Sequence, residues 1–183
     1  MENLRFRLMH EEALKRLQDA EILEDARLLR ELSDFPLLDS SSSDSAYLLR
    51  LLGFELLLKL IYEFVLDKEA ENKHSYEKFF GELPQELQDR LLSLAGASVG
   101  PTKLASEHMT VLQELGKNFV GLRYPWVRYA NLTEADYSRI SAEWYSKGML
   151  DEEAKFRFHP DELTGLLAAL VKVANEIKLL QNK

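Results

Sequence analysis

Residues 45–66 read SAYLLRLLGFELLLKLIYEFVL, and nearly every position in this stretch is large and apolar. A helix that is apolar almost all round has to be buried on most sides. Glu55, Lys59 and Glu63 follow one another at intervals of four residues, so these charged side chains share one face of the helix. The stretch therefore predicts the central helix of an all-α domain, with a single polar stripe along it.

The remaining sequence favours further helices and no strands. Apolar residues recur at steps of three and four, which is the spacing of one helix face. We predict an up-and-down helical bundle of about six to seven helices. Gly96 is expected to cap the fourth helix at its carboxyl end. The helices expected besides the central one cover residues 2–32, 75–81, 84–96, 102–121 and 133–148, and the last begins at Pro160.

A chain of 183 residues fits one domain. We predict a single helical domain over residues 1–183, in which residues 129–158 form an embellishment before the last bundle helix. That last helix carries an apolar seam along one face, which favours packing on the domain's own core over a coiled coil with a second chain. The seam comprises Leu163, Leu166, Leu170, Val173, Ile177 and Leu180.

Composition and charge narrow the classes of protein to which the chain can belong. The absence of cysteine excludes disulfides, thiolate metal ligands and a cysteine nucleophile. A net charge of −8 excludes the overall basic surface of a general nucleic-acid coat, although a local RNA site needs only a few arginines. The charged amino-terminal segment lacks the apolar core of a secretory signal. Charges within the most apolar stretch are costly in lipid, so we expect no membrane span and a cytoplasmic location.

No familiar catalytic or cofactor motif occurs in the sequence. There is no glycine-rich phosphate loop, no Gly-x-Ser-x-Gly elbow and no His-Glu-x-x-His zinc motif. We therefore expect no cofactor and no metal site. The scattered histidines are interpreted as surface or helix-end residues, and they are His10, His74, His108 and His159.

Two segments place charge among apolar residues, and each has two interpretations. Glu55, Lys59 and Glu63 form either a solvated seam of intrahelical ion pairs or a polar group aimed into a cleft between helices. Pro125 forces Tyr124 out of helical geometry and bends the chain there. The aromatic residues at this bend either plug the end of the core or stand beside an arginine, Arg123, that binds an anion.

Three groups of residues stand in a characteristic order along the chain. The first group is Ala46-Tyr47-Leu48, followed by Glu55-Leu-Leu-Leu-Lys59. The second group is His74-Ser-Tyr76, followed by Phe79-Phe80 and Leu83-Pro84. The third group is Phe119-Val-Gly-Leu-Arg123-Tyr-Pro125. In this order and spacing the chain resembles the HEPN superfamily, the higher-eukaryote and prokaryote nucleotide-binding helical domains. The likeness covers roughly residues 10–128 and, by position, the final helix. It implies a HEPN-like helical bundle, often a homodimer.

The chain departs from the active ribonucleases of that superfamily. Those enzymes carry Arg-x(4–6)-His in a late helix, and the two residues act on the ribose hydroxyl and the scissile phosphate. No histidine follows Arg123 within six residues here, and the only Arg-x4-His runs from Arg5 to His10 in the first helix. The usual acid–base group for RNA cleavage is therefore missing from its place. The resemblance implies a degenerate member, and an enzyme is not our preferred interpretation.

Three functions remain open at the level of sequence. The first is a non-catalytic binding or interaction module that holds a nucleotide or RNA-like anion near Arg123, or a partner protein. The second is a metal-independent ribonuclease toxin of a defence or toxin–antitoxin system, with His74 or His108 as a non-standard base. The third is a purely structural scaffold. We predict a homodimer, no catalytic residue, and ligand-binding residues that comprise Arg123, Tyr124, Trp126, Lys59, Glu55 and Arg128.

Overall fold

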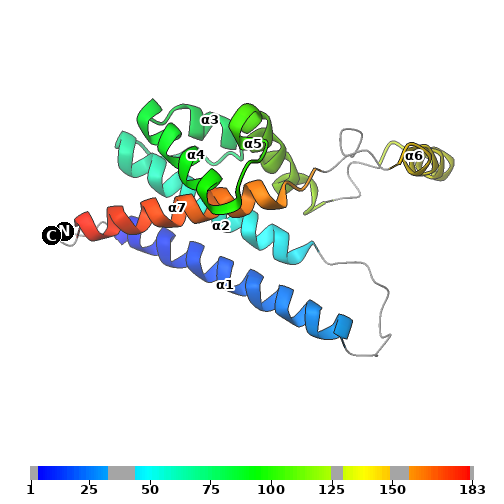
Figure 1. The fold of residues 1–183 in the computed structure, drawn as a ribbon, viewed down its shortest axis with the longest axis horizontal. Coiled ribbons are helices and arrows are strands. Elements are labelled where there is room, and N and C mark those ends of the chain that lie inside the picture. Colours follow the sequence, from blue (N-terminus) through cyan, green and yellow to red (C-terminus); the bar gives the residue numbers. More distant parts are fainter. Residues whose placement is uncertain (1–3, 33–43, 125–129, 149–156, 182–183) are drawn as a thin grey trace.

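The computed structural model describes residues 4–32, 44–124, 130–148 and 157–181, and every regular element in these ranges is a helix (Figure 1). The prediction of an all-α helical bundle is confirmed. The described ranges contain seven helices: α1 (Leu4–Leu32), α2 (Ser45–Leu66), α3 (Tyr76–Gly81), α4 (Gln85–Val99), α5 (Leu104–Gly121), α6 (Glu134–Ser146) and α7 (Pro160–Gln181).

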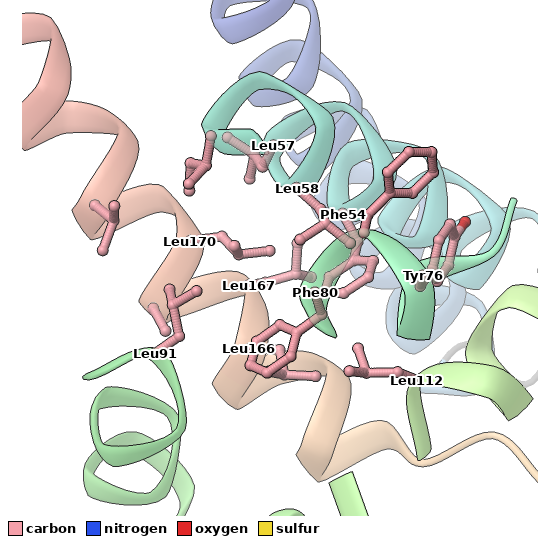
Figure 2. Close-up of a cluster of buried hydrophobic side chains, with 14 of the residues drawn as sticks. Phe54, Leu57, Leu58, Tyr76, Phe80, Leu91, Leu112, Leu166, Leu167 and Leu170 are labelled. Carbon is pink, nitrogen blue, oxygen red and sulfur yellow. The ribbon is translucent and has the colours of Figure 1, made fainter. Parts of the chain in front are cut away.

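The helix α2 runs through the middle of the bundle, as its apolar sequence predicts. It packs against α1 on one side and against α7, α3 and α5 on others. Its side chains Phe54, Leu57 and Leu58 are at most 1% exposed. Figure 2 shows Leu57 and Leu58 on the side of α2 that faces α7, while the Phe54 ring lies toward Tyr76 of α3, 5.1 Å away between centroids. Because burying one such side chain contributes roughly 2 kcal/mol, α2 supplies much of the apolar core.

The apolar seam of α7 packs on the core of its own bundle. Its residues from Leu163 to Ile177 are buried between α4 and α2. The seam was predicted to continue to Leu180, and this part of the prediction is wrong. Leu180 is 64% exposed and its neighbour Leu179 is 66% exposed, because α7 reaches the end of the bundle there.

The end of α4 also differs from the prediction. The helix continues past Gly96 to Val99, so Gly96 is not its cap. Gly100 ends the helix instead, with a φ of 84° and its N–H bonded to the Gly96 carbonyl oxygen. A glycine adopts this left-handed backbone without the clash that a Cβ would cause.

The helix α6 stands apart from the bundle (Figure 1), and none of its side chains is buried. A capping box starts it, in which the Thr133 side chain accepts from the Asp136 N–H and the Asp136 carboxylate accepts from the Thr133 N–H. The single domain with an embellishment at 129–158 stays a prediction, since 149–156 lie outside the described residues. Among the described helices, none has both the length and the apolar character needed to cross a membrane.

Candidate functional site

The charged residues Glu55, Lys59 and Glu63 of α2 point in different directions around the helix axis. Glu55 and Lys59 are only 7% and 9% exposed, and Lys59 Nζ donates a hydrogen bond of 2.8 Å to Glu55 Oε1. Glu63 faces α1, where Arg5 Nε donates to Glu63 Oε2 at 2.7 Å. The charged stripe therefore winds around α2, from the buried Glu55 to Glu63 beside α1. Each four-residue step turns about 40° around a helix, so Glu63 points roughly 80° away from Glu55.

The environment of Glu63 favours its charged form. Burial opposes ionisation of this carboxyl group, but hydrogen bonds from Arg5 and from the Ala70 N–H outweigh that cost. The pKa of Glu63 is consequently lowered from its ordinary value. This pair stabilises the contact between α1 and α2 and lies apart from the residues discussed next.

Glu55 is the centre of a buried hydrogen-bond network. Besides the bond from Lys59, its Oε2 accepts one of 3.1 Å from the Tyr76 hydroxyl and lies 2.7 Å from His74 Nδ1. Tyr76 is fully buried, and burial together with the negative charge of Glu55 raises the pKa of its hydroxyl well above the ordinary value. Tyr76 therefore stays protonated and donates, so three donors from α2, the 72–75 segment and α3 converge on one carboxylate.

The network orients the imidazole of His74. Its Nδ1 faces a carboxylate, which only accepts, so Nδ1 carries a proton. Its Nε2 lies 3.4 Å from Nη2 of Arg123, and a guanidinium only donates, so Nε2 presents a lone pair. The imidazole of His74 is thus held between Glu55 and Arg123, with Nδ1 toward the carboxylate and Nε2 toward the guanidinium.

The guanidinium of Arg123 sits just beyond the end of α5. Its Nε donates to the Phe119 carbonyl oxygen at 3.1 Å, and its central carbon lies 4.4 Å from the centroid of the Phe119 ring. The same ring lies 4.9 Å from the imidazole of His74. Within the described part of the chain no carboxylate forms an ion pair with Arg123. The exposed guanidinium is therefore held in place by described residues that do not neutralise its charge.

A groove of about 690 Å³ opens beside this network, between the 72–77 segment and the end of α5. Its volume is within the roughly 300–1,000 Å³ that ligand sites occupy. His74 and Tyr124 are part of its wall, and Arg123 reaches the same imidazole from outside the lining. The remaining lining residues are Asn72, Lys73, Ser75, Glu77, Gln113, Gly116, Lys117, Val120 and Gly121.

The structure brings only some of the predicted ligand-binding residues together. Arg123 and Glu55 meet through His74, and Tyr124, which is 52% exposed, lines the groove. Lys59 is buried behind Glu55, with its Nζ 5.4 Å from the centroid of the Phe79 ring, and it does not line the groove. Trp126 and Arg128 lie outside the described residues.

His74 was not among the predicted ligand-binding residues. The sequence feature that could have identified it is its place in the His74-Ser-Tyr76 motif, one residue before the N-cap position of α3. The interpretation of the histidines as surface or helix-end residues is wrong for His10, which is 2% exposed and lies six residues after the first residue of α1. His108, the other base considered for Arg123, packs its ring 6.0 Å from that of Phe80.

Comparison with known proteins identifies no relative. No family model matches the chain, and neither a search of curated proteins nor a search of solved structures found a significant match. The likeness to the HEPN superfamily therefore stays a hypothesis. Function has to be inferred from the site itself.

Proposed function

We propose that this protein is a non-catalytic binding module that holds a nucleotide or a short RNA-like anion at Arg123 and His74. The observation that carries the proposal is the exposed guanidinium of Arg123, 3.4 Å from His74 Nε2 and without an ion pair to a described carboxylate. Guanidinium groups bind phosphate with two parallel N–H donors, which is stronger than a neutral hydrogen bond.

The groove supplies the other contacts that such a ligand needs. Lys117 lines it and brings positive charge near a phosphate, as does Lys73, whose Nζ also pairs with Glu71 at 2.8 Å. Among the described lining residues, Glu77 is the one carboxylate. The exposed aromatic ring of Tyr124 can stack on a base, an interaction that tolerates any base. Since the whole chain carries a net charge of −8, repulsion favours a ligand with few phosphates over a long RNA.

Calorimetric titration with adenosine monophosphate and with a short single-stranded RNA tests this function. We expect Arg123→Ala to weaken binding by roughly tenfold or more, because one charge-assisted hydrogen bond contributes about 1.5–3 kcal/mol. Arg90→Ala is the matched control, since it removes an equal charge from α4, where Arg90 pairs with Glu176 at 2.6 Å. The proposal is wrong if neither probe binds, or if both variants weaken binding equally.

A second candidate function, metal-independent RNA cleavage, is favoured by the position of His74 beside Arg123. A phosphate that draws the guanidinium onto itself would leave the Nε2 lone pair of His74 free to act as a base. Nε2 would take the proton of a ribose 2′-hydroxyl, whose oxygen attacks phosphorus while the bond to the 5′ oxygen breaks. The 5′ oxygen would leave as a hydroxyl group after it takes a proton from the imidazolium or from water. Arg123 would stabilise the added negative charge, and Glu55 would orient the imidazole.

Incubation of a fluorescently labelled RNA with the protein and a chelator distinguishes the two functions. Cleavage that His74→Gln abolishes, while RNA binding persists, would support the ribonuclease. His108→Gln is its control, because that ring lies beside Phe80 rather than Arg123. Binding without any cleavage by the wild-type protein would leave the binding module as the function.

A further inference from the structure

The helix α1 has an outer face that the bundle does not cover. Its buried residues, among them Phe6, Ala13 and Ala20, define the side that faces α2, and Figure 1 shows α1 at the edge of the molecule. At 3.6 residues per turn, one row of side chains lies opposite that buried side. All members of this outer row are exposed, and they are Leu4, Leu8, Glu11, Lys15, Gln18 and Ile22.

The outer row has apolar ends and a charged middle. Leu4, Leu8 and Ile22 are 58%, 54% and 58% exposed, which is a large apolar area for one helix face. Glu11 and Lys15 stand one turn apart, in the order that suits an intrahelical ion pair. Within the residues that the structure describes, neither side chain forms an ion pair.

The outer row is complementary to itself in the antiparallel direction. A two-fold axis that passes the outer face of α1 at the level of residue 13 would set Leu4 against Ile22 of a second copy and Leu8 against its Gln18. It would set Glu11 against the second copy's Lys15, and the same ion pair would form twice. A closed two-fold interface requires this reciprocity, in which each contact occurs once in either direction.

We propose that the outer row of α1 is the docking surface for a second copy of this chain. The two α1 helices pack antiparallel, with two Glu11–Lys15 ion pairs at the centre and apolar contacts at both ends. The row from Leu4 to Ile22 is about 27 Å long at 1.5 Å per residue. One helix pair of that length buries less than the roughly 800 Å² per partner of a stable interface. The dimer is therefore weak, and its population depends on the protein concentration.

Sedimentation velocity over a range of concentrations at low salt tests this interface. We expect a concentration-dependent dimer, weakened about tenfold or more by Glu11→Lys or by Lys15→Glu, because each variant opposes like charges across the interface. The double variant Glu11→Lys/Lys15→Glu restores opposite charges in the same positions and should restore dimerisation. The outer row faces solvent, so the thermal unfolding midpoint of each variant provides the check that folding is unchanged.

A second variant tests the apolar ends of the outer row. Ile22→Glu places a carboxylate opposite Leu4 of the second copy and should abolish the dimer without changing the fold. A protein that stays monomeric at every concentration contradicts the proposal. So does a dimer whose dissociation constant is unchanged by Glu11→Lys and by Ile22→Glu, because its interface would then lie elsewhere.

Discussion

Replacing Glu55 with glutamine should lower the free energy of unfolding by about 3–5 kcal/mol, the usual cost of leaving one partner of a buried ion pair unpaired. Glutamine preserves the volume of the side chain but not its charge. Lys59, 9% exposed, would keep its ammonium group without the carboxylate 2.8 Å away. Urea unfolding followed by far-ultraviolet circular dichroism measures this loss.

Two further variants test whether the loss of stability comes from the buried Glu55–Lys59 pair or would follow the loss of any carboxylate. Glu63→Gln removes the partner of Arg5, whose side chain is 53% exposed, and should cost less than about 1 kcal/mol. The double variant Glu55→Gln/Lys59→Met removes the orphaned charge and should recover most of the lost stability, since apolar replacements of buried pairs are often neutral. Equal losses in Glu55→Gln and Glu63→Gln would mean that the pair at Glu55 is effectively solvated.

Replacing Gly116 with alanine should destabilise the protein and weaken anion binding together. Gly116 lies in α5, and a Cβ there would come closer than 3.0 Å to the backbone carbonyl oxygen of His74. A backbone atom cannot rotate away as a side chain can, so the 72–75 segment must shift. We expect a loss of about 1–3 kcal/mol from overpacking. The shift would also move the imidazole of His74 away from Glu55 and Arg123.

Gly96→Ala is the matched control for this substitution. Gly96 is also helical, but nothing lies within 4 Å of the Cβ that alanine would add. The control should therefore gain about 0.5–1 kcal/mol, because alanine loses less backbone entropy in a helix than glycine. Thermal unfolding of both variants, with a titration of adenosine monophosphate, compares them. A stabilised Gly116→Ala protein with normal anion binding would show that the contact with His74 is not tight.

The sequence was sufficient to predict the position of α2 in the fold. A stretch that is apolar all round has no solvated face, so it has to lie among other helices. The Glu55–Lys59 contact was also predictable, since side chains four residues apart on a helix are neighbours. The turn of Glu63 toward α1 follows from the same helix geometry and could have been derived before the structure was known.

The position of His74 could not be predicted in this way. It lies 19 residues from Glu55 and 49 from Arg123 in the sequence, outside any helix, so no periodicity links the three. Their meeting depends on how α3 and α5 pack on α2, which is a tertiary effect. The same holds for the close approach of Gly116 to the His74 carbonyl oxygen.

The most direct test of the proposed site is a long-range nitrogen–proton NMR spectrum of the histidine rings, recorded with and without adenosine monophosphate. We predict that His74 alone is a neutral Nδ1–H imidazole facing a cation, and that its Nε2 resonance shifts on adding the ligand as Arg123 turns to the phosphate. His10, His108 and His159 should stay unchanged. A His74 resonance that does not respond, or four histidines that respond alike, would contradict anion binding at Arg123.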